Sequence, residues 1–135
     1  MPIMNWSEQY SVGVSELDNH HKKLINLLND LHDAMKQGKS KELTAGIINE
    51  LVSYAANHFA AEEKYMVKFN FPGYQKHKSE HESFVAKVVD FQNDYNAGKM
   101  LLTVEIMDFL KQWLINHIQK TDKEYGPFFN EKGLH

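Results

Sequence analysis

The sequence predicts an all-α protein, an up-down-up-down antiparallel four-helix bundle with an irregular N-terminal arm. Four long segments repeat apolar residues at alternating three- and four-residue steps, which is typical of helices with one buried stripe. The breaks between these segments are short and contain turn residues, namely Gly38, Pro72 with Gly73, and Gly98. Because short connections make consecutive helices antiparallel neighbours, the pattern favours a bundle.

The arm is expected to cover residues 1–14, with Trp6 and Tyr10 packed on the bundle. The whole chain, residues 1–135, has the usual length of one domain and is expected to form a single unit. The four helices are expected at about 17–37, 41–68, 74–97 and 101–121.

The helix ends carry signals of their own. Ser15 and Asp18 fit a capping box at the start of the first helix, and Ser40 fits the N-cap of the second. The tail after Asp122 contains two glycines and a proline, so it is predicted to be non-helical.

Composition excludes several classes of function. The 135 residues are 42% apolar and 24% charged, and the net charge of −3 gives no reason to expect nucleic acid as a partner. There is no cysteine, so disulfides, thiolate nucleophiles and cysteine-based metal sites are excluded. No signal peptide is recognised, and no apolar run approaches the ~18 residues of a membrane span. We therefore expect a cytoplasmic monomer without membrane insertion.

Histidine is unusually frequent, with eight residues, and five of them fall on the predicted buried stripes. In an antiparallel bundle, the starts of helices one and three share one end with the ends of helices two and four. The five imidazoles should therefore converge at one level, beside the carboxylate of Glu62. The five histidines are His21, His58, His77, His81 and His117.

A metal site explains this convergence better than simple packing does. A single histidine on an apolar face is usually a packed core residue. Five imidazoles and a carboxylate buried without partners would cost several kcal/mol for each unsatisfied group. Helical i, i+4 spacing pairs His58 with Glu62 and His77 with His81 on shared faces. Glu63 is rotated toward the flank and is predicted to be solvated surface.

The number of donors indicates two metals rather than one. Five histidines and Glu62 exceed the four to six ligands of a single ion, so a bridging carboxylate is expected. The second bridge is predicted to be Asp122, five residues after His117, which requires either the helix end or a π-type bulge between Ile118 and Asp122. With one oxo or hydroxo bridge, about eleven of about twelve octahedral positions are filled, and one stays open for a small ligand.

These residues resemble the hemerythrin family, most closely its single-domain bacterial members, the bacteriohemerythrins. The resemblance rests on four segments and covers nearly the whole chain. They are DNHHKKL around His21, HFAAEEKYM around His58 and Glu62, HKSEH for His77 and His81, and WLINHIQKTD for His117 and Asp122.

The resemblance implies reversible O2 binding at a non-haem di-iron centre (Fe2+/Fe3+) with an oxo or hydroxo bridge, for O2 storage, transport or delivery to an O2-consuming enzyme. It implies that one iron is saturated by three histidines and that the other, bound by two, is open. Asp18 favours His21 over His20 as a ligand, since the family pattern is D-x-x-H. The implied ligands are His77, His81 and His117 on the saturated iron, His21 and His58 on the open iron, and Glu62 and Asp122 as bridges.

An apolar O2 pocket is expected beside the metals, formed by Phe59, Trp113, Leu114 and Ile118. Bulky apolar side chains here would keep water away and slow autoxidation, although the same residues also suit an ordinary bundle core. Outer hydrogen-bond partners should fix each imidazole, and Glu80 and Tyr125 are the candidates.

Three other functions compete with O2 binding. A di-iron oxidase or peroxidase is one, but ferritin-like enzymes use more carboxylates, and no acid–base residue lies on the pocket stripes. No catalytic residue is therefore assigned. An O2 or nitric oxide sensor acting through a partner is another. A metal-free structural bundle leaves the converging histidines unexplained.

Overall fold

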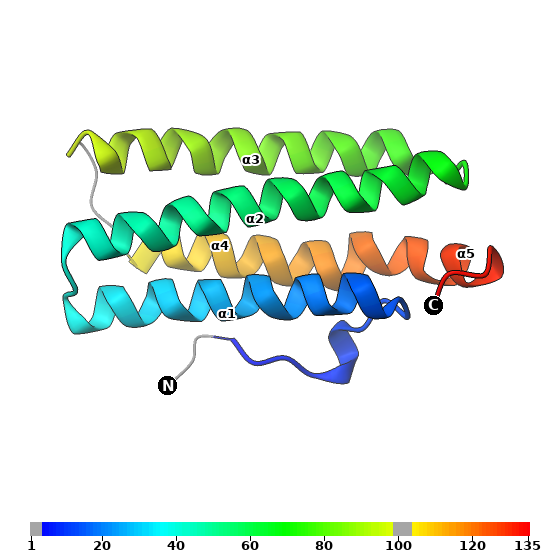
Figure 1. Ribbon diagram of the computed structural model, residues 1–135, viewed down its shortest axis with the longest axis horizontal. Coiled ribbons are helices and arrows are strands. Elements are labelled where there is room, and N and C mark those ends of the chain that lie inside the picture. Colours follow the sequence, from blue (N-terminus) through cyan, green and yellow to red (C-terminus); the bar gives the residue numbers. More distant parts are fainter. Residues whose placement is uncertain (1–3, 99–103) are drawn as a thin grey trace.

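The computed structural model describes residues 4–98 and 104–135 and confirms the all-α four-helix bundle. The four long helices lie side by side with alternating directions (Figure 1). The start of the fourth predicted helix, at residue 101, lies outside the described residues. Within the described ranges, no helix is long and apolar enough to cross a membrane. The long helices are α1 (Ser15–Gln37), α2 (Lys41–Lys68), α3 (Tyr74–Asn96) and α4 (Val104–Asn116).

The core consists of two apolar clusters separated by a buried polar layer. On α1, His21 lies between Leu17 of one cluster and Leu24 of the other, and all three are buried. On α2, Glu62 falls in the same way between Phe59 and Met66. The larger cluster fills most of the bundle, with members such as Leu28, Leu31, Ile48, Leu51, Phe84, Val88 and Leu110.

The cap predicted for α2 is confirmed, and the one predicted for α1 is wrong. The Ser40 side chain accepts a hydrogen bond from the backbone N–H of Leu43. Helix α1 instead follows Val14, which provides no side-chain cap. Asp18 turns back to the arm, where it accepts the Val12 N–H at 2.8 Å and the Ser11 hydroxyl at 2.6 Å. It therefore fastens the arm rather than completing a capping box.

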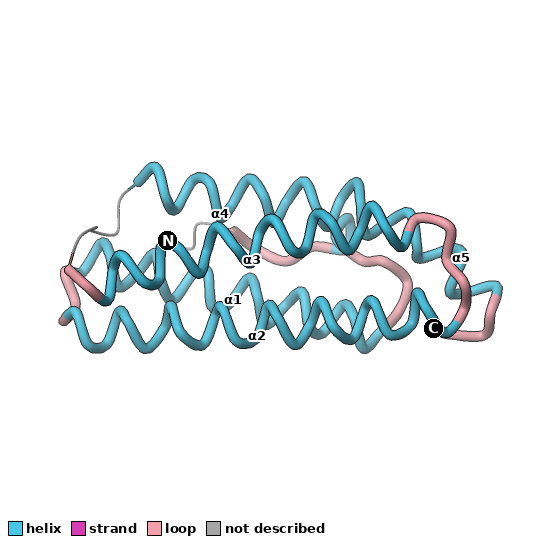
Figure 2. Tube along the Cα trace, turned by 90° about the horizontal axis from the view of Figure 1, so that it is seen from above, coloured by secondary structure: helices cyan, strands magenta, loops and turns pink. Residues whose placement is uncertain are grey.

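The N-terminal arm runs lengthwise along the bundle (Figures 1 and 2). The Asn29 side chain on α1 holds the backbone of Met4 through two hydrogen bonds, of 3.1 and 2.7 Å. Tyr10, at the end of the short 3-10 helix Glu8–Tyr10, is buried, and Trp6 packs against the core. The predicted packing of both aromatic residues is confirmed.

The prediction of a non-helical tail is wrong. A π-helical turn, His117–Thr121, follows α4, and a 3-10 turn, Asp122–Glu124, leads into α5, Tyr125–Glu131. Pro127 is tolerated because it stands in the first turn of α5, where a backbone N–H has no helical partner. Burial of apolar side chains from α5 against the arm outweighs the weak helix propensity of the tail.

The contact between α5 and the arm yields a prediction about Gly126. A Cβ at Gly126 would lie 2.2 Å from the Val12 carbonyl oxygen, whereas a Cβ at Gly46 on α2 would meet nothing within 4 Å. Gly126→Ala should therefore lower the free energy of unfolding by about 1–3 kcal/mol, as overpacking does. Gly46→Ala should raise it by about 0.5–1 kcal/mol. Chemical denaturation measures both, and equal effects of the two substitutions would contradict the close contact.

Candidate metal centre

The seven side chains predicted as metal ligands converge at one end of the bundle. All of them are buried, with at most 3% of any residue exposed. Ligand atoms from four residues gather within 4.8 Å in one group, His21, His58, Glu62 and Asp122. They gather within the same limit in a second group, Glu62, His81, His117 and Asp122. The seventh residue, His77, places Nε2 3.0 Å from Oδ1 of Asp122.

Predicted ligands that are close in sequence also lie close together in space. On α2, Nε2 of His58 lies 3.0 Å from Oε1 of Glu62, one turn later. The π-helical turn brings the more distant pair together, because the Asp122 N–H donates to the His117 carbonyl five residues earlier. Nε2 of His117 then lies 2.9 Å from Oδ1 of Asp122. Of the two predicted alternatives, a helix end or a π-type bulge, the structure contains the π-type bulge.

The two oxygens of Asp122 face different histidines. Oδ1 contacts His77 and His117, and Oδ2 lies 3.0 Å from Nε2 of His21. Glu62 also lies between the two sides, since its Oε1 is 3.0 Å from His58 and 3.5 Å from His81. Both carboxylates therefore have the placement that a bridging ligand needs.

The donor spacing in the layer matches that of ligands around one metal ion, and several donors have no hydrogen bond. Nε2 of His81 and Nε2 of His117 are 2.9 Å apart. A metal–ligand bond of about 2.1 Å places neighbouring ligands of an octahedral ion about 3.0 Å apart. Among the described residues, several inward-facing atoms make no hydrogen bond of acceptable geometry despite their close neighbours. They are Nε2 of His21, Nε2 of His58, Oε1 of Glu62 and Oδ2 of Asp122.

Both carboxylates are held ionised in spite of their burial. Burial alone would raise the pKa of Asp122, but contact with His117 and two other imidazoles holds that pKa well below its usual range. Burial and the Asp122 charge also oppose ionisation of Glu62, and His58 outweighs them, so the pKa of Glu62 is lowered. Two carboxylates that favour the ionised form thus lie where a cation would bind.

The imidazoles respond to burial and to this charge. Burial lowers the pKa of His81 to about 3, so its ring is neutral and has a lone pair for a metal. Burial acts in the same direction on His21 and His117, but Asp122 outweighs it and raises the pKa of both. Burial and the Glu62 charge raise the pKa of Tyr125 well above its usual range, which keeps its hydroxyl protonated.

Outer hydrogen-bond partners differ from those the sequence suggested. The expectation that Glu63 is solvated surface is wrong, because its Oε2 lies 3.0 Å from Nδ1 of His81 and its side chain is only 23% exposed. The prediction considered only the position of Glu63 on α2, whereas Glu63 contacts His81 on α3. Among the outer candidates, Tyr125 donates its hydroxyl to Oε2 of Glu62, not to an imidazole. The Glu80 charge is among those that raise the pKa of His117.

His20, the neighbour of the predicted ligand His21, lies outside the layer. Its Nδ1 is 2.9 Å from Nδ1 of His58, and its ring meets the Tyr54 ring edge-on at 6.0 Å between centroids. Of the two adjacent histidines, only His21 belongs to a potential metal-binding group. His20 therefore occupies an outer position that sequence reasoning missed.

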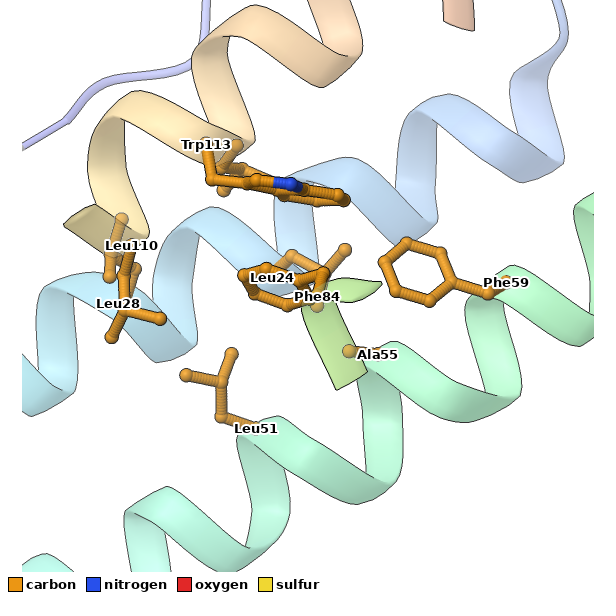
Figure 3. A pocket seen from close by; sticks show the side chains of 9 residues that line it. Leu24, Leu28, Leu51, Ala55, Phe59, Phe84, Leu110 and Trp113 are labelled. Atoms are coloured by element: carbon orange, nitrogen blue, oxygen red, sulfur yellow. The ribbon is translucent and has the colours of Figure 1, made fainter. Parts of the chain in front are cut away.

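Aromatic rings cover the layer on its apolar side. Phe59 stacks on His81 with 3.9 Å between centroids, and Trp113 stacks on His117 at 4.4 Å. Beyond them lies a cavity of about 20 Å³, enough for about one water-sized molecule. Figure 3 shows Phe59 and Trp113 facing it together with the neighbouring leucines. Its lining is entirely apolar: Leu24, Leu28, Leu51, Ala55, Phe59, Phe84, Leu110, Trp113 and Leu114.

Three of the four predicted pocket residues line the cavity, and the fourth does not. Phe59, Trp113 and Leu114 line the cavity, while Ile118 is fully buried in the adjacent core and does not line it. Leu24, Ala55 and Leu114 each lie three residues from a histidine of the layer, so the cavity is about one helical turn from the metal-binding atoms.

Comparison with known proteins identifies the family. The Hemerythrin HHE cation binding domain matches residues 12–129. The bacteriohemerythrin of Methylococcus capsulatus is 33% identical over 94% of this chain and 97% of its own, and that of Pseudomonas aeruginosa is 36% identical over 93% and 80%. A crystal structure of wild-type hemerythrin matches at a TM-score of 0.89, with 32% identity over 93% of this chain and 96% of its own. Since the matched domain spans almost the entire described bundle and both groups of buried donors, the chain belongs to the hemerythrin family.

Proposed function

We propose that this protein binds dioxygen reversibly at a non-haem di-iron centre, for O2 storage, transport or delivery. The observation that carries the proposal is the sharing of Glu62 and Asp122 by two groups of buried donors. Two metals bound side by side need such shared carboxylates, whereas two independent mononuclear sites do not. Membership of the hemerythrin family supports the same interpretation.

The donors are divided unequally between the two positions. Two histidines would hold one iron and three the other, so the first position has a protein ligand fewer and room for a small molecule. The proposed ligands are His21 and His58 for the first iron, His77, His81 and His117 for the second, and Glu62 and Asp122 for both. When bound with an oxo or hydroxo bridge, the iron pair would supply the electrons that O2 binding requires.

The chain contributes orientation and exclusion of water. Tyr125 donates to Oε2 of Glu62, which fixes the carboxylate that both positions share. Phe59 and Trp113 hold the planes of two imidazoles by stacking. The cavity next to them is lined by hydrophobic side chains, so it offers room for a diatomic molecule and almost no polar surface to hold water.

This arrangement favours binding over turnover. A di-iron oxidase or peroxidase, or a sensor that acts through a partner, would use a similar metal pair. The cavity, however, is lined only by apolar side chains, so it offers an organic substrate no orienting polar group. Repeated uptake and release of O2 distinguishes a carrier from an oxidase, which consumes it.

The proposal predicts a visible spectrum that cycles with O2. Iron-loaded, reduced protein is prepared anaerobically. It should develop an absorption band when air is admitted, lose the band when O2 is removed, and repeat this over several cycles. Glu62→Ala should abolish the band, because both donor groups lose a member. Glu50→Ala is the matched control on α2, since the Glu50 side chain is 56% exposed and its ion pair is with Lys23, away from the metal centre. One irreversible oxidation without a recoverable band would contradict a carrier.

The apolar wall of the cavity should determine how long the oxygenated form lasts before it autoxidises. Leu114→Ala enlarges the apolar space one turn before His117, so water should enter and autoxidation should become severalfold faster. The same substitution should lower the free energy of unfolding by about 2–5 kcal/mol, as deletion of buried leucine atoms does. Leu43→Ala, at a residue that is 50% exposed, should change neither value. The decay of the O2-dependent band measures the rate, and an unchanged decay in Leu114→Ala would exclude this role.

A further inference from the structure

All five buried imidazoles of the metal centre point the same nitrogen inward. Nε2 faces the carboxylates or another imidazole in His21, His58, His77, His81 and His117. Nδ1 is therefore the outer nitrogen of each ring. Only two of these outer nitrogens have a hydrogen-bond partner within residues 4–98 and 104–135. Those two are Nδ1 of His58 and Nδ1 of His81.

The two supported rings belong to opposite halves of the centre. His58 is in the donor group with His21, and its outer partner is His20, at 2.9 Å. His81 is in the donor group with His117, and its outer partner is Glu63, at 3.0 Å. Each half of the site thus has one imidazole whose orientation is fixed from outside.

We infer that His20 and Glu63 are positioning residues, one for each of the two metal positions, and that they make these positions chemically unequal. The inference deepens the proposed function, because it rests on the two-metal centre described above. It assigns His20 to the position with two histidines and Glu63 to the position with three.

The inequality follows from the chemistry of the two acceptors. A neutral imidazole that binds a metal through Nε2 carries its proton on Nδ1 and donates it outward. His20 can accept that proton only through a neutral lone pair, which gives an ordinary hydrogen bond. Glu63 accepts with a carboxylate, and hydrogen bonds to charged acceptors are roughly twice as strong. His81 should therefore be the more basic ligand, and its position should bind a metal more tightly.

The two outer residues have different surroundings. The ring of His20 lies edge-on to Tyr54 and also to His58, at 6.0 and 5.0 Å between centroids. Glu63 lies in a groove between α2 and α3 that His81 and Val85 also line. A hydrogen-bond partner restricts rotation of the ring that it contacts, which is how an outer residue affects metal affinity.

Stepwise titration of the metal-free protein with Co2+, in competition with a chelator, tests the inference. His20→Ala should weaken one of the two binding steps by about 10–100-fold, and Glu63→Ala should weaken the other by a similar factor. His20→Asn should restore most of the loss, because its Oδ1 is attached to Cγ as Nδ1 is in histidine. Glu63→Gln should restore part of it, since it keeps an acceptor but loses the charge.

Controls separate this effect from general destabilisation. Asn19→Ala and Lys64→Ala alter exposed neighbours and should leave both steps unchanged. Thermal unfolding of each metal-free variant should be similar within the His20 set and within the Glu63 set. If the alanine variants bind both ions as the wild type does, or if Asn and Gln restore nothing, the inference is wrong.

A second measurement on the wild type needs no substitution. In the zinc-loaded protein, NMR should detect two slowly exchanging imidazole Nδ1–H protons, one each from His58 and His81. Their absence would overturn the inference. Binding of fewer than two Co2+ ions by the wild type would instead contradict the proposed function, so the two failures are distinguishable.

Discussion

The buried layer of two ionised carboxylates and five imidazoles is the constraint on which the rest of the fold depends. Charge buried away from water is tolerated only when partners surround it. Asp122 is fully buried and lies within 3.0 Å of imidazole nitrogens from three helical segments. Every helix must therefore present its donor at the same height. Short connections and two apolar clusters, one on each side of the layer, keep the helices in that register.

The apolar side of the layer is as specific as the polar side. Stacking of Phe59 on His81 and of Trp113 on His117 uses the flat faces of these imidazoles, while their edges point to the carboxylates. The same two aromatic rings then line the cavity. One set of contacts thus orients the metal-binding nitrogens and excludes polar groups from the adjacent space, which links rigidity of the site to control of access.

Much of this arrangement could be predicted from the sequence, because it depends on spacing within single helices. Helical periodicity placed His58 beside Glu62, and the five-residue interval between His117 and Asp122 required either a helix end or the π-type turn that the structure contains. The role of Glu63 could not be predicted in this way. It lies on the flank of its own helix, and only the approach of α3 brings His81 within 3.0 Å. Contacts between helices depend on how the helices pack, which periodicity does not specify.

The prediction of a non-helical C-terminal segment was wrong for a related reason. Its glycines and proline argued against a helix when taken as local signals. Gly126 instead allows the backbone of α5 to approach the Val12 carbonyl, where any side chain would collide. That approach buries Tyr125 and Phe129 completely. The helix is therefore stabilised by a tertiary contact with an arm more than a hundred residues earlier in the chain, and no local pattern contains that information.

The π-helical turn connects these observations. In a regular α-helix, a residue five positions after His117 would point about 140° away from it. The wider turn removes most of this rotation and brings Asp122 into the layer, 2.9 Å from His117. Because Tyr125 follows Asp122 by three residues, it shares the same face and reaches Glu62. A single irregular turn therefore supplies both the second shared carboxylate and the hydroxyl that fixes the first, so its cost in backbone regularity is offset by two buried contacts at the centre.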